Sequence, residues 1–495
     1  MPVQIPSKYN QKFLQKPLLT CVLSLGIGFM CLGPSGTALA QQSIQASPES
    51  ATQARDILRD LIAAKSIHAN GSTRSAQMIA DRLIAGSYSH DEVQVLAPKE
   101  YPTKGNVVVR MRGKRDAGTQ EKPVLYIGHL DVVDAKREDW NFDPFTLTEK
   151  DGWLYGRGTI DMLGQAAAYV TTMLRLKKEG FIPQRDIILA LTADEEAEGN
   201  ANGVAWLLKE HKALIDASLV INPDAGEAAI KNGRKLYLTA QTSEKVFLTF
   251  GLEVTDKGGH SSRPTAHNPI DRLAKGLHKL SGFNFPLHLT DTVKLYFAGR
   301  SNLESGQKKA DMLAVSLAKP DQAAVRRLSQ EVETNIMLRT TCTTTEISGG
   351  HAENALPQRA RATVQCRVIP GESQAQVEAQ LRKVLQDDSI KISVITAAKP
   401  TPESPPSPAI FNAVASVAKR MWPEVIVLPN MSAGASDSVF TRNAGLPTYG
   451  IDAMFDDLDD SRAHGRDERI SVKGFNEEIE FVYRLVKAID KLPSK

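Results

Sequence analysis

The sequence carries no surplus of either charge once its first forty residues are set aside. Its 495 residues include 60 Lys and Arg and 57 Asp and Glu, but residues 1–40 contain three of the lysines and no Asp, Glu or Arg. The remaining 57 basic residues balance 57 acidic residues. Because proteins that bind nucleic acids usually carry a basic surplus, we expect no nucleic-acid partner.

Internal repeats and low-complexity tracts are absent as well, which excludes collagen-like, coiled-coil and disordered chains. Hydrophobic residues make up 42% of the chain and charged residues 24%, as in ordinary globular proteins. The length is about three times that of a typical single domain, so we expect two domains.

The apolar stretch at residues 17–32 is short and interrupted by glycines, which argues against a membrane anchor. It follows three lysines, and the segment ends on Ala38-Leu39-Ala40, with small residues at the two positions that a signal peptidase recognises. This pattern predicts an export signal over residues 1–40, cleaved before Gln41. We therefore expect a periplasmic or secreted protein with no stable membrane anchor.

Cysteine is scarce, and only Cys342 and Cys366 follow the expected signal. An oxidising compartment permits a disulfide between them, but the spacing gives no information on the distance between their Cα atoms. Two alternatives stay open: a disulfide between these cysteines, or two unpaired cysteines in the core.

Strand-like and helix-like segments alternate over the first half of the mature chain. Apolar residues recur with helical spacing at 47–67 and 76–84, and further helices are expected at 164–177 and 201–211. Strands are expected at 106–112, 124–127, 186–193 and 218–221. This alternation predicts an α/β fold with a mainly parallel sheet flanked by helices.

The pattern changes near residue 240, where longer alternating segments at 246–254 and 360–368 are interleaved with helical ones at 271–280, 323–333 and 374–385. A Pro-rich stretch at 399–406 can continue neither a strand nor a helix. Beyond it, a helix at 409–421, a strand at 448–451 and a helix at 476–492 restore the first pattern. We predict a main domain of residues 41–240 and 401–495 with an α+β domain, 241–400, inserted into it.

Candidate metal ligands follow the expected strands. His129 stands just beyond the strand at 124–127, and Glu196 belongs to an acidic run after the strand at 186–193. Taken singly, such residues are more often a structural histidine, a turn aspartate and a solvated acidic loop. Acids gathered at one sheet edge would repel one another unless a cation neutralised them. The full set is two histidines and three carboxylates: His129, Asp161, Glu196, Asp224 and His464.

This donor set suits a pair of zinc ions with one carboxylate bridging them. Asp131, two residues after His129, can accept the other N–H of that imidazole and fix its orientation. Glu195 adjoins Glu196 but points elsewhere, so it suits proton transfer to and from a reacting water.

Six runs stand in an order that resembles the aminoacylase/glutamate carboxypeptidase family of co-catalytic zinc peptidases, peptidase family M20. The similarity covers essentially residues 50–490. The runs are 128–133, 140–145, 156–161, 194–196, 258–262 and 464–468.

The resemblance implies a zinc-exopeptidase-like catalytic domain with an inserted lid or dimerisation domain, and thus a possible homodimer. It implies two Zn²⁺ per chain, with Co²⁺ or Mn²⁺ as substitutes, and cleavage of the amide bond of peptides or N-acyl amino acids with a free carboxylate. Whether the enzyme is an aminopeptidase, a carboxypeptidase or an aminoacylase stays open.

The resemblance also implies a role for each site residue. His129 and Glu196 are similar to terminal ligands of the two different metals, Asp161 to the bridging ligand, and His464 and Asp224 fill the remaining terminal places. Asp131 resembles the residue that orients the histidine, and Glu195 the general base.

Three residues of the inserted domain are similar to the family's substrate-binding residues. His260 resembles a histidine that steadies the tetrahedral intermediate, in some members from the partner subunit. Asn354 and Arg367 resemble lid residues that bind the substrate's carbonyl and carboxylate, and a guanidinium suits a carboxylate because it forms two parallel hydrogen bonds.

The chain departs from the family at three places. Met162-Leu163 replaces the usual acid and its neighbour after Asp161, and we expect a cis peptide bond between Asp161 and Met162. Gln365 stands where an acid usually precedes Arg367. Around Asp224 the order relative to proline differs, so Glu227 is a substitute ligand. Met162 and Gln365 favour an alternative, a catalytically silent metal-bearing protein that binds peptides, whereas the intact Glu195 argues against it.

Overall fold

The computed structural model describes residues 43–114, 121–197 and 201–493. The expected export signal, residues 1–40, lies outside these ranges. Among the helices within them, none combines the length and the apolar character needed to span a bilayer.

The main sheet has a parallel centre, as the sequence predicts. Strands β6, β3, β7 and β17 run parallel to one another, whereas β2 and β9 add to this centre in antiparallel fashion. The strand order is β1 (Val93–Leu96), β2 (Asn106–Met111), β6 (Ile187–Thr192), β3 (Val124–His129), β7 (Leu219–Asn222), β17 (Thr448–Ile451), β9 (Arg234–Glu244), β8 (Ala228–Lys231) and β18 (Asp456–Asp457), with β16 (Ile426–Ser432) paired to β9.

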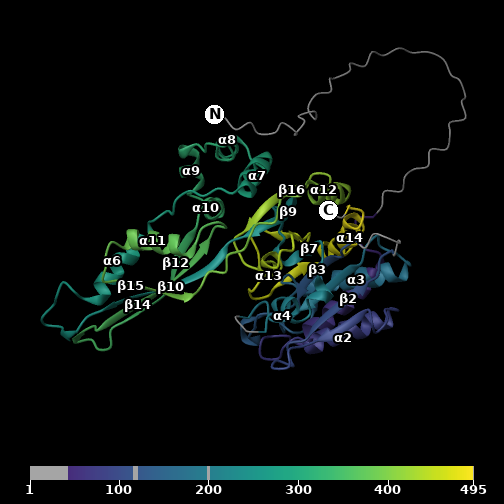
Figure 1. Ribbon diagram of the computed structural model, residues 1–495, viewed down its shortest axis with the longest axis horizontal. Helices are drawn as coiled ribbons and strands as arrows, with labels where there is room; N and C mark the ends of the chain where they lie inside the picture. The colour runs from purple at the N-terminus through teal and green to yellow at the C-terminus, as the bar shows by residue number, and fades with distance from the viewer. Residues whose placement is uncertain (1–42, 115–120, 198–200, 494–495) are drawn as a thin grey trace, which may run out of the picture. The chain divides into compact units, whose positions relative to one another are not determined.

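Helices cover both faces of this sheet (Figure 1). Alternate residues of β3 show the two faces, because Val124 and Tyr126 join one hydrophobic cluster while Leu125 and Ile127 join another. The first cluster packs against α1 (Pro48–Ala64), α2 (Thr73–Ala85), α3 (Leu163–Lys178), α12 (Pro408–Met421) and α14 (Val472–Ile489). The second packs against α4 (Gly203–Glu210) and α13 (Ser438–Asn443). Burial on both faces explains why the central strands are apolar at nearly every position.

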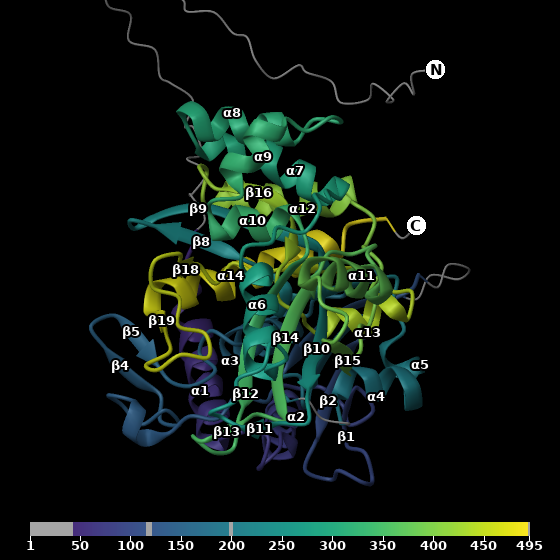
Figure 2. The ribbon, with the colours of Figure 1, turned by 90° about the vertical axis from the view of Figure 1, so that its left-hand side faces the viewer.

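A second, antiparallel sheet has its own hydrophobic core. Its strands are β12 (Thr341–Gly349), β14 (Arg359–Val368), β10 (Val246–Thr255) and β15 (Lys391–Thr396), in that order. Helices α6 (Pro269–Ser281) and α11 (Gln374–Leu385) cover one face (Figures 1 and 2). This sheet lies within residues 241–400, for which the inserted domain is predicted.

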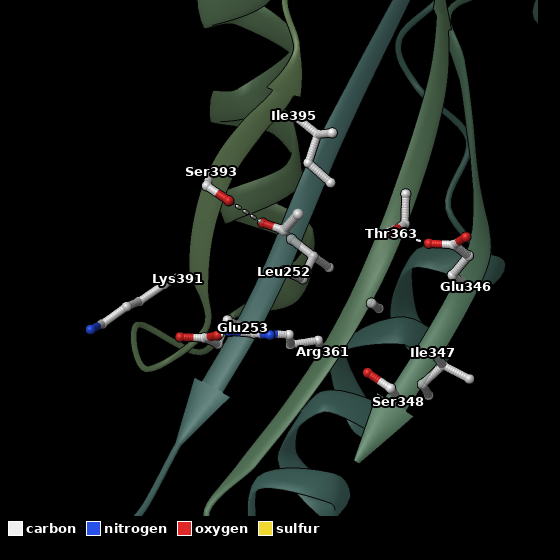
Figure 3. A pocket seen from close by; sticks show the side chains of 12 residues that line it. Leu252, Glu253, Glu346, Ile347, Ser348, Arg361, Thr363, Lys391, Ser393 and Ile395 are labelled. Carbon is white, nitrogen blue, oxygen red and sulfur yellow. Dashed lines mark hydrogen bonds and ion pairs between the residues drawn. The ribbon is translucent and has the colours of Figure 1, made fainter.

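The other face of the second sheet is open. Glu253, Arg361 and Ser393 alternate with the residues that pack under the helices, and they line a hollow of about 750 Å³ (Figure 3). The Arg361 guanidinium donates to Glu253 over 2.6 Å on this face. Arg367 follows Arg361 on β14 by an even number of residues and therefore belongs to the same face.

Four short helices between α6 and β12 form a helical segment beside β16 (Figure 2). They are α7 (Asp291–Arg300), α8 (Gly306–Val315), α9 (Gln322–Leu328) and α10 (Val332–Leu338). The single helix predicted at 323–333 is wrong, because the chain breaks at residues 329–331 between α9 and α10. Met431 of β16 shares a hydrophobic cluster with these helices, which ties the helical segment to the main sheet.

A disulfide joins Cys342 of β12 to Cys366 of β14. The two residues lie directly opposite each other in the antiparallel pairing, with their Cα atoms 4.0 Å apart. The structure therefore answers the question that the cysteine spacing left open.

Candidate metal centre

Five of the predicted metal-binding side chains converge at one edge of the main sheet. His129 ends β3, Glu196 follows β6, and Asp224 lies in a short 3₁₀ helix directly after β7. Asp161 precedes α3, and His464 lies in the loop before β19 (Arg469–Ser471). His129, Glu196 and Asp224 lie together because parallel strands end at the same edge. The loops that carry Asp161 and His464 reach this edge from elsewhere in the chain.

Asp161 lies at the centre of the cluster, with its two carboxylate oxygens facing different histidines. Its Oδ1 lies 3.2 Å from Nε2 of His129, and its Oδ2 lies 3.0 Å from Nε2 of His464. Asp224 Oδ1 is 3.8 Å from the same His129 nitrogen, and Glu196 Oε1 is 2.9 Å from His464 Nε2. These five donors therefore include two groups, His129 with Asp224 and His464 with Glu196, that share Asp161. A bridging ligand holds two metal ions in this way.

The two imidazoles alter the charge of this centre. Although burial opposes it, hydrogen bonds from His129 and His464 hold the pKa of Asp161 well below its usual range. Asp161 and Glu196 in turn raise the pKa of His464 to about 10.

The other carboxylates of the centre have too few positively charged groups nearby to balance their negative charge. Burial raises the pKa of Glu195 and of Asp224, and each has another carboxylate nearby that raises it further. Burial also raises the pKa of Glu196. Divalent cations would neutralise this excess of buried acids, and imidazole nitrogens with carboxylate oxygens are donors that bind zinc. The residues present therefore fit a metal pair.

Asp131 contacts a different partner from the one predicted. The imidazole Nδ1 of His129 lies 2.9 Å from the backbone carbonyl of Asp131, whereas the carboxylate is 3.8 Å away. The carboxylate instead accepts the backbone N–H groups of Glu195 and Glu196, at 3.1 and 3.0 Å. Asp131 thus orients the histidine through its main chain and fixes the acidic loop through its side chain.

Asp194 anchors the other side of that loop. It is buried, has a positive φ of 62°, and pairs with Lys104 and with His68. Glu195, the next residue, belongs to a donor group with His129 and Glu196, whose ligand atoms lie within 4.8 Å of one another. The loop therefore presents two neighbouring carboxylates to the same centre.

Glu468 is a positioning residue that the sequence analysis missed. It is fully buried and accepts an N–H of Arg157 at 2.7 Å, together with the backbone N–H groups of Gly158, Ile160 and Asp161. These bonds fix the glycine-flanked turn that presents Asp161. The signal was available, because Glu468 lies in the same run of residues as His464.

Asp437 was also missed, and no sequence pattern indicated it. This buried residue accepts hydrogen bonds from Asn202 at 2.6 Å and from Thr192, at the end of β6, at 3.3 Å. Burial raises its pKa to about 7, and Asp224 adds to the effect. Asp437 therefore adds a further acid beside the centre.

The peptide bond between Asp161 and Met162 is cis, which confirms the prediction. Met162 is buried, and its sulfur lies 3.3 Å from the backbone nitrogen of His129. Glu227, the substitute ligand, belongs to neither donor group, since its carboxylate binds Tyr237 and Asn430.

The three predicted substrate-binding residues lie on the second sheet and its neighbouring ribbon. His260, on β11 (Gly259–His260), and Asn354 are exposed and adjacent, because the Ser261 amide donates to the Asn354 carbonyl over 3.0 Å. Arg367 lies over the ring of Phe247, 4.9 Å from its centroid. In the part of the chain that the structure describes, no hydrogen bond or ion pair joins these three residues to the metal centre.

Comparison with known proteins gives a consistent result. The model for peptidase family M20/M25/M40 matches residues 125–488. Over 383 residues, 75% of this chain and 72% of the relative, the sequence is 30% identical to "Probable carboxypeptidase S-like 2" of Dictyostelium discoideum. It is 28% identical over 385 residues, 74% of each chain, to the human "N-fatty-acyl-amino acid synthase/hydrolase PM20D1".

Among solved structures, the fold resembles that of an M20 family metallo-carboxypeptidase, Sso-CP2, from Sulfolobus solfataricus. The TM-score is 0.63 at 20% sequence identity, over 89% of this chain and 100% of that one.

Proposed function

Because the chain belongs to peptidase family M20/M25/M40, we propose that it is a dinuclear zinc hydrolase of amide bonds. Its substrates are peptides or N-acyl amino acids with a free carboxylate, as the names of the carboxypeptidase-like and N-acyl-amino-acid relatives suggest. The observation that carries the proposal is Asp161, whose two oxygens face two separate donor groups.

His129 and Asp224 would hold one zinc ion, His464 and Glu196 the other, and Asp161 would bridge them. When bound, such a pair polarises a carbonyl and lowers the pKa of a shared water; Co²⁺ or Mn²⁺ are possible substitutes. Glu195 takes the proton of the attacking water and returns it to the leaving nitrogen.

The inserted domain supplies the contacts to the substrate in this proposal. Arg367 binds the free carboxylate, Asn354 the carbonyl, and His260 steadies the negative oxygen of the tetrahedral intermediate. Within residues 43–114, 121–197 and 201–493, no hydrogen bond or ion pair joins the ribbon that carries His260 to the metal centre of the same chain. We therefore include a homodimer, in which His260 of the partner subunit serves this role.

The compartment is a separate part of the proposal. A disulfide between Cys342 and Cys366 suits an oxidising environment, and residues 1–40 have the pattern of an export signal. Both observations support a periplasmic or secreted enzyme.

Metal stoichiometry and turnover of matched variants test the proposal together. We expect about two zinc ions per chain in the purified protein, about one in Asp224→Ala, and almost none in Asp161→Ala, because only the latter residue is shared. Glu227→Ala should keep both ions, since its carboxylate belongs to neither donor group. Equal metal loss in Asp161→Ala and Asp224→Ala would contradict the bridging arrangement.

Glu195→Ala should keep both ions yet lose turnover by about 10²–10⁴-fold, the usual contribution of a general base. The assay is a panel of dipeptides and N-acyl amino acids with zinc and with cobalt. Glu210→Ala, an exposed glutamate of α4, is the control. Retained turnover in Glu195→Ala would remove the base assignment, and a metal-loaded protein that hydrolyses none of the panel would be the silent binding protein.

A further inference from the structure

A cavity of about 230 Å³ lies beside Asp224, between the main sheet and the helical segment. Its floor includes Glu227, which follows β7, together with Tyr237 of β9 and Asn430 of β16. Its other wall comes from α7 and α10. Because Asp224 belongs to the candidate metal centre, a group that occupies this cavity lies beside one of the proposed metal ligands.

The floor of the cavity holds a carboxylate at a fixed position. Tyr237 Oη donates to one oxygen of Glu227 over 2.6 Å, and the Asn430 amide donates to the other over 3.3 Å. Two donors suit an ionised carboxylate, which only accepts hydrogen bonds. Burial raises the pKa of Glu227, whereas the hydrogen bond from Tyr237 and the charge of Arg300 lower it.

The wall of the cavity adds more negative than positive charge. Glu333 of α10 is a second carboxylate on this wall. The cation that faces them, Arg300 of α7, already pairs with Glu304 over 2.8 Å and lies 5.4 Å from the ring centroid of Tyr237. Besides Asp224, the cavity is lined by two carboxylates and one shared guanidinium, which favours a positively charged occupant.

The volume limits the size of that occupant. An engineered apolar cavity of about 150 Å³ in another protein holds benzene, which corresponds to about 25 Å³ per non-hydrogen atom. At that density this cavity holds about nine atoms. A lysyl group has seven non-hydrogen atoms beyond its carbonyl, counting the α-carbon and both nitrogens, and therefore fits. A lauroyl chain has eleven carbons beyond its carbonyl and exceeds this volume.

Resting on the proposed amide hydrolysis, we infer that this cavity binds the acyl side of the substrate and selects a short, positively charged group over a long alkyl chain. The free carboxylate, on the other side of the scissile bond, binds Arg367 of the second sheet in the proposed function. The helical segment thus acts as a specificity element, because α7 and α10 form one wall of the cavity.

Three substrates that share a leaving phenylalanine test this inference. Lysyl-phenylalanine and norleucyl-phenylalanine differ by the terminal ammonium group, and N-lauroyl-phenylalanine carries the long chain. We expect kcat/KM to be at least tenfold higher for the lysyl substrate than for the norleucyl one, and lowest for the lauroyl one. Glu227→Gln should bring the ratio of lysyl to norleucyl substrate close to one, whereas the surface variant Glu210→Gln should leave it unchanged.

A second variant tests the size limit. Ile336 of α10 lines the cavity, and Ile336→Trp should raise KM for the lysyl substrate at least tenfold. The control is Ile182→Trp, at an isoleucine that is 61% exposed and does not line the cavity. Thermal unfolding of each variant verifies that it folds.

If all three substrates are hydrolysed and kcat/KM for the lauroyl substrate equals or exceeds that for the lysyl one, the inference is overturned and the proposed function stays intact. If none is hydrolysed, the wider panel of dipeptides and N-acyl amino acids decides the proposed function, and binding decides the inference. Calorimetric titration of the Glu195→Ala protein should then show at least tenfold tighter binding of the lysyl compound than of the other two. Equal affinities would overturn it.

Discussion

Replacing Glu468 with Gln removes one charge from the support of the metal centre and keeps the shape of the side chain. The wild-type carboxylate is fully buried and accepts four N–H groups, one from Arg157 and three from the main chain of residues 158, 160 and 161. The glutamine amide must turn its own N–H₂ group toward some of these donors. The variant therefore leaves a buried guanidinium without its anion and disturbs the turn that carries Asp161.

The expected loss in the free energy of unfolding follows from two opposing contributions. Removing one partner of a buried ion pair costs about 3–5 kcal/mol, and each backbone hydrogen bond lost adds about 1 kcal/mol. Against this, burial raises the pKa of Glu468, so its ionised form already opposes folding to some extent. We expect a net loss of about 3 kcal/mol. The affinity for metal should fall about 10–100-fold, as for other residues that orient metal ligands.

Urea unfolding and zinc titration of the same protein samples measure both effects. Arg157→Met serves as the second arm of a double-mutant cycle, because it removes the opposite charge. The double variant should lose at least 1 kcal/mol less than the sum of the single variants, since no unpaired charge remains. Additive losses, or Glu468→Gln with unchanged metal affinity, would refute this account of how the turn is held.

Two further predictions concern the frame around the site. Replacing Cys342 and Cys366 together with Ala should lower the free energy of unfolding by about 3 kcal/mol, because the disulfide closes a loop with a sequence separation of 24; urea unfolding checks this, and a midpoint like that of the wild type would contradict it. Glu244, which pairs with Arg442 in the core, has its pKa raised by burial to about 7. The folded state therefore holds that proton more tightly than the unfolded state, and the contribution lowers stability by about 3 kcal/mol as the pH rises from about 4.5 to 7. Glu244→Gln should remove this fall. The check is the free energy of unfolding of both proteins across that pH range. If it changes with pH equally in the wild type and the variant, the residue has no such role.

The central sheet was predictable because burial of its strands produces a strong apolar pattern in the sequence. Strands such as β3 and β6 are covered on both faces, so nearly every position is apolar. Helix α11 was predicted with its observed bounds because its apolar spacing is regular and Ser373 and Gln376 form a capping box at its start.

The helical segment was harder to predict because its helices are short and take much of their burial from other elements. Phe297 of α7 packs with Met431 of β16, a contact that local periodicity does not reveal. The break between α9 and α10 is another example, since residues 323–333 keep helical spacing although the chain turns at 329–331.

The convergence of His129, Glu196 and Asp224 was predictable for a topological reason, because these residues follow strands β3, β6 and β7 and the ends of parallel strands meet whatever the intervening sequence. The contact made by Asp131 was not, because a spacing of two residues does not determine whether the histidine binds a carbonyl or a carboxylate. The roles of the five converging residues as metal ligands stay predictions.

The acidic residues of this centre have two different roles, as proposed metal ligands and as supports of the loops, and residue type alone does not distinguish them. Asp161 and Glu196 turn their carboxylates toward histidines, whereas Asp131 and Glu468 turn theirs toward backbone N–H groups of the loops that carry those two residues. A carboxylate that accepts several N–H groups fixes a loop more firmly than a single backbone bond does, because charge-assisted hydrogen bonds are stronger. Each of the two loops is thus held by a buried acid from a distant part of the chain. The positions of these two proposed ligands therefore depend on acids that would not touch the metal, and a search for ligands by residue type alone cannot separate the two groups.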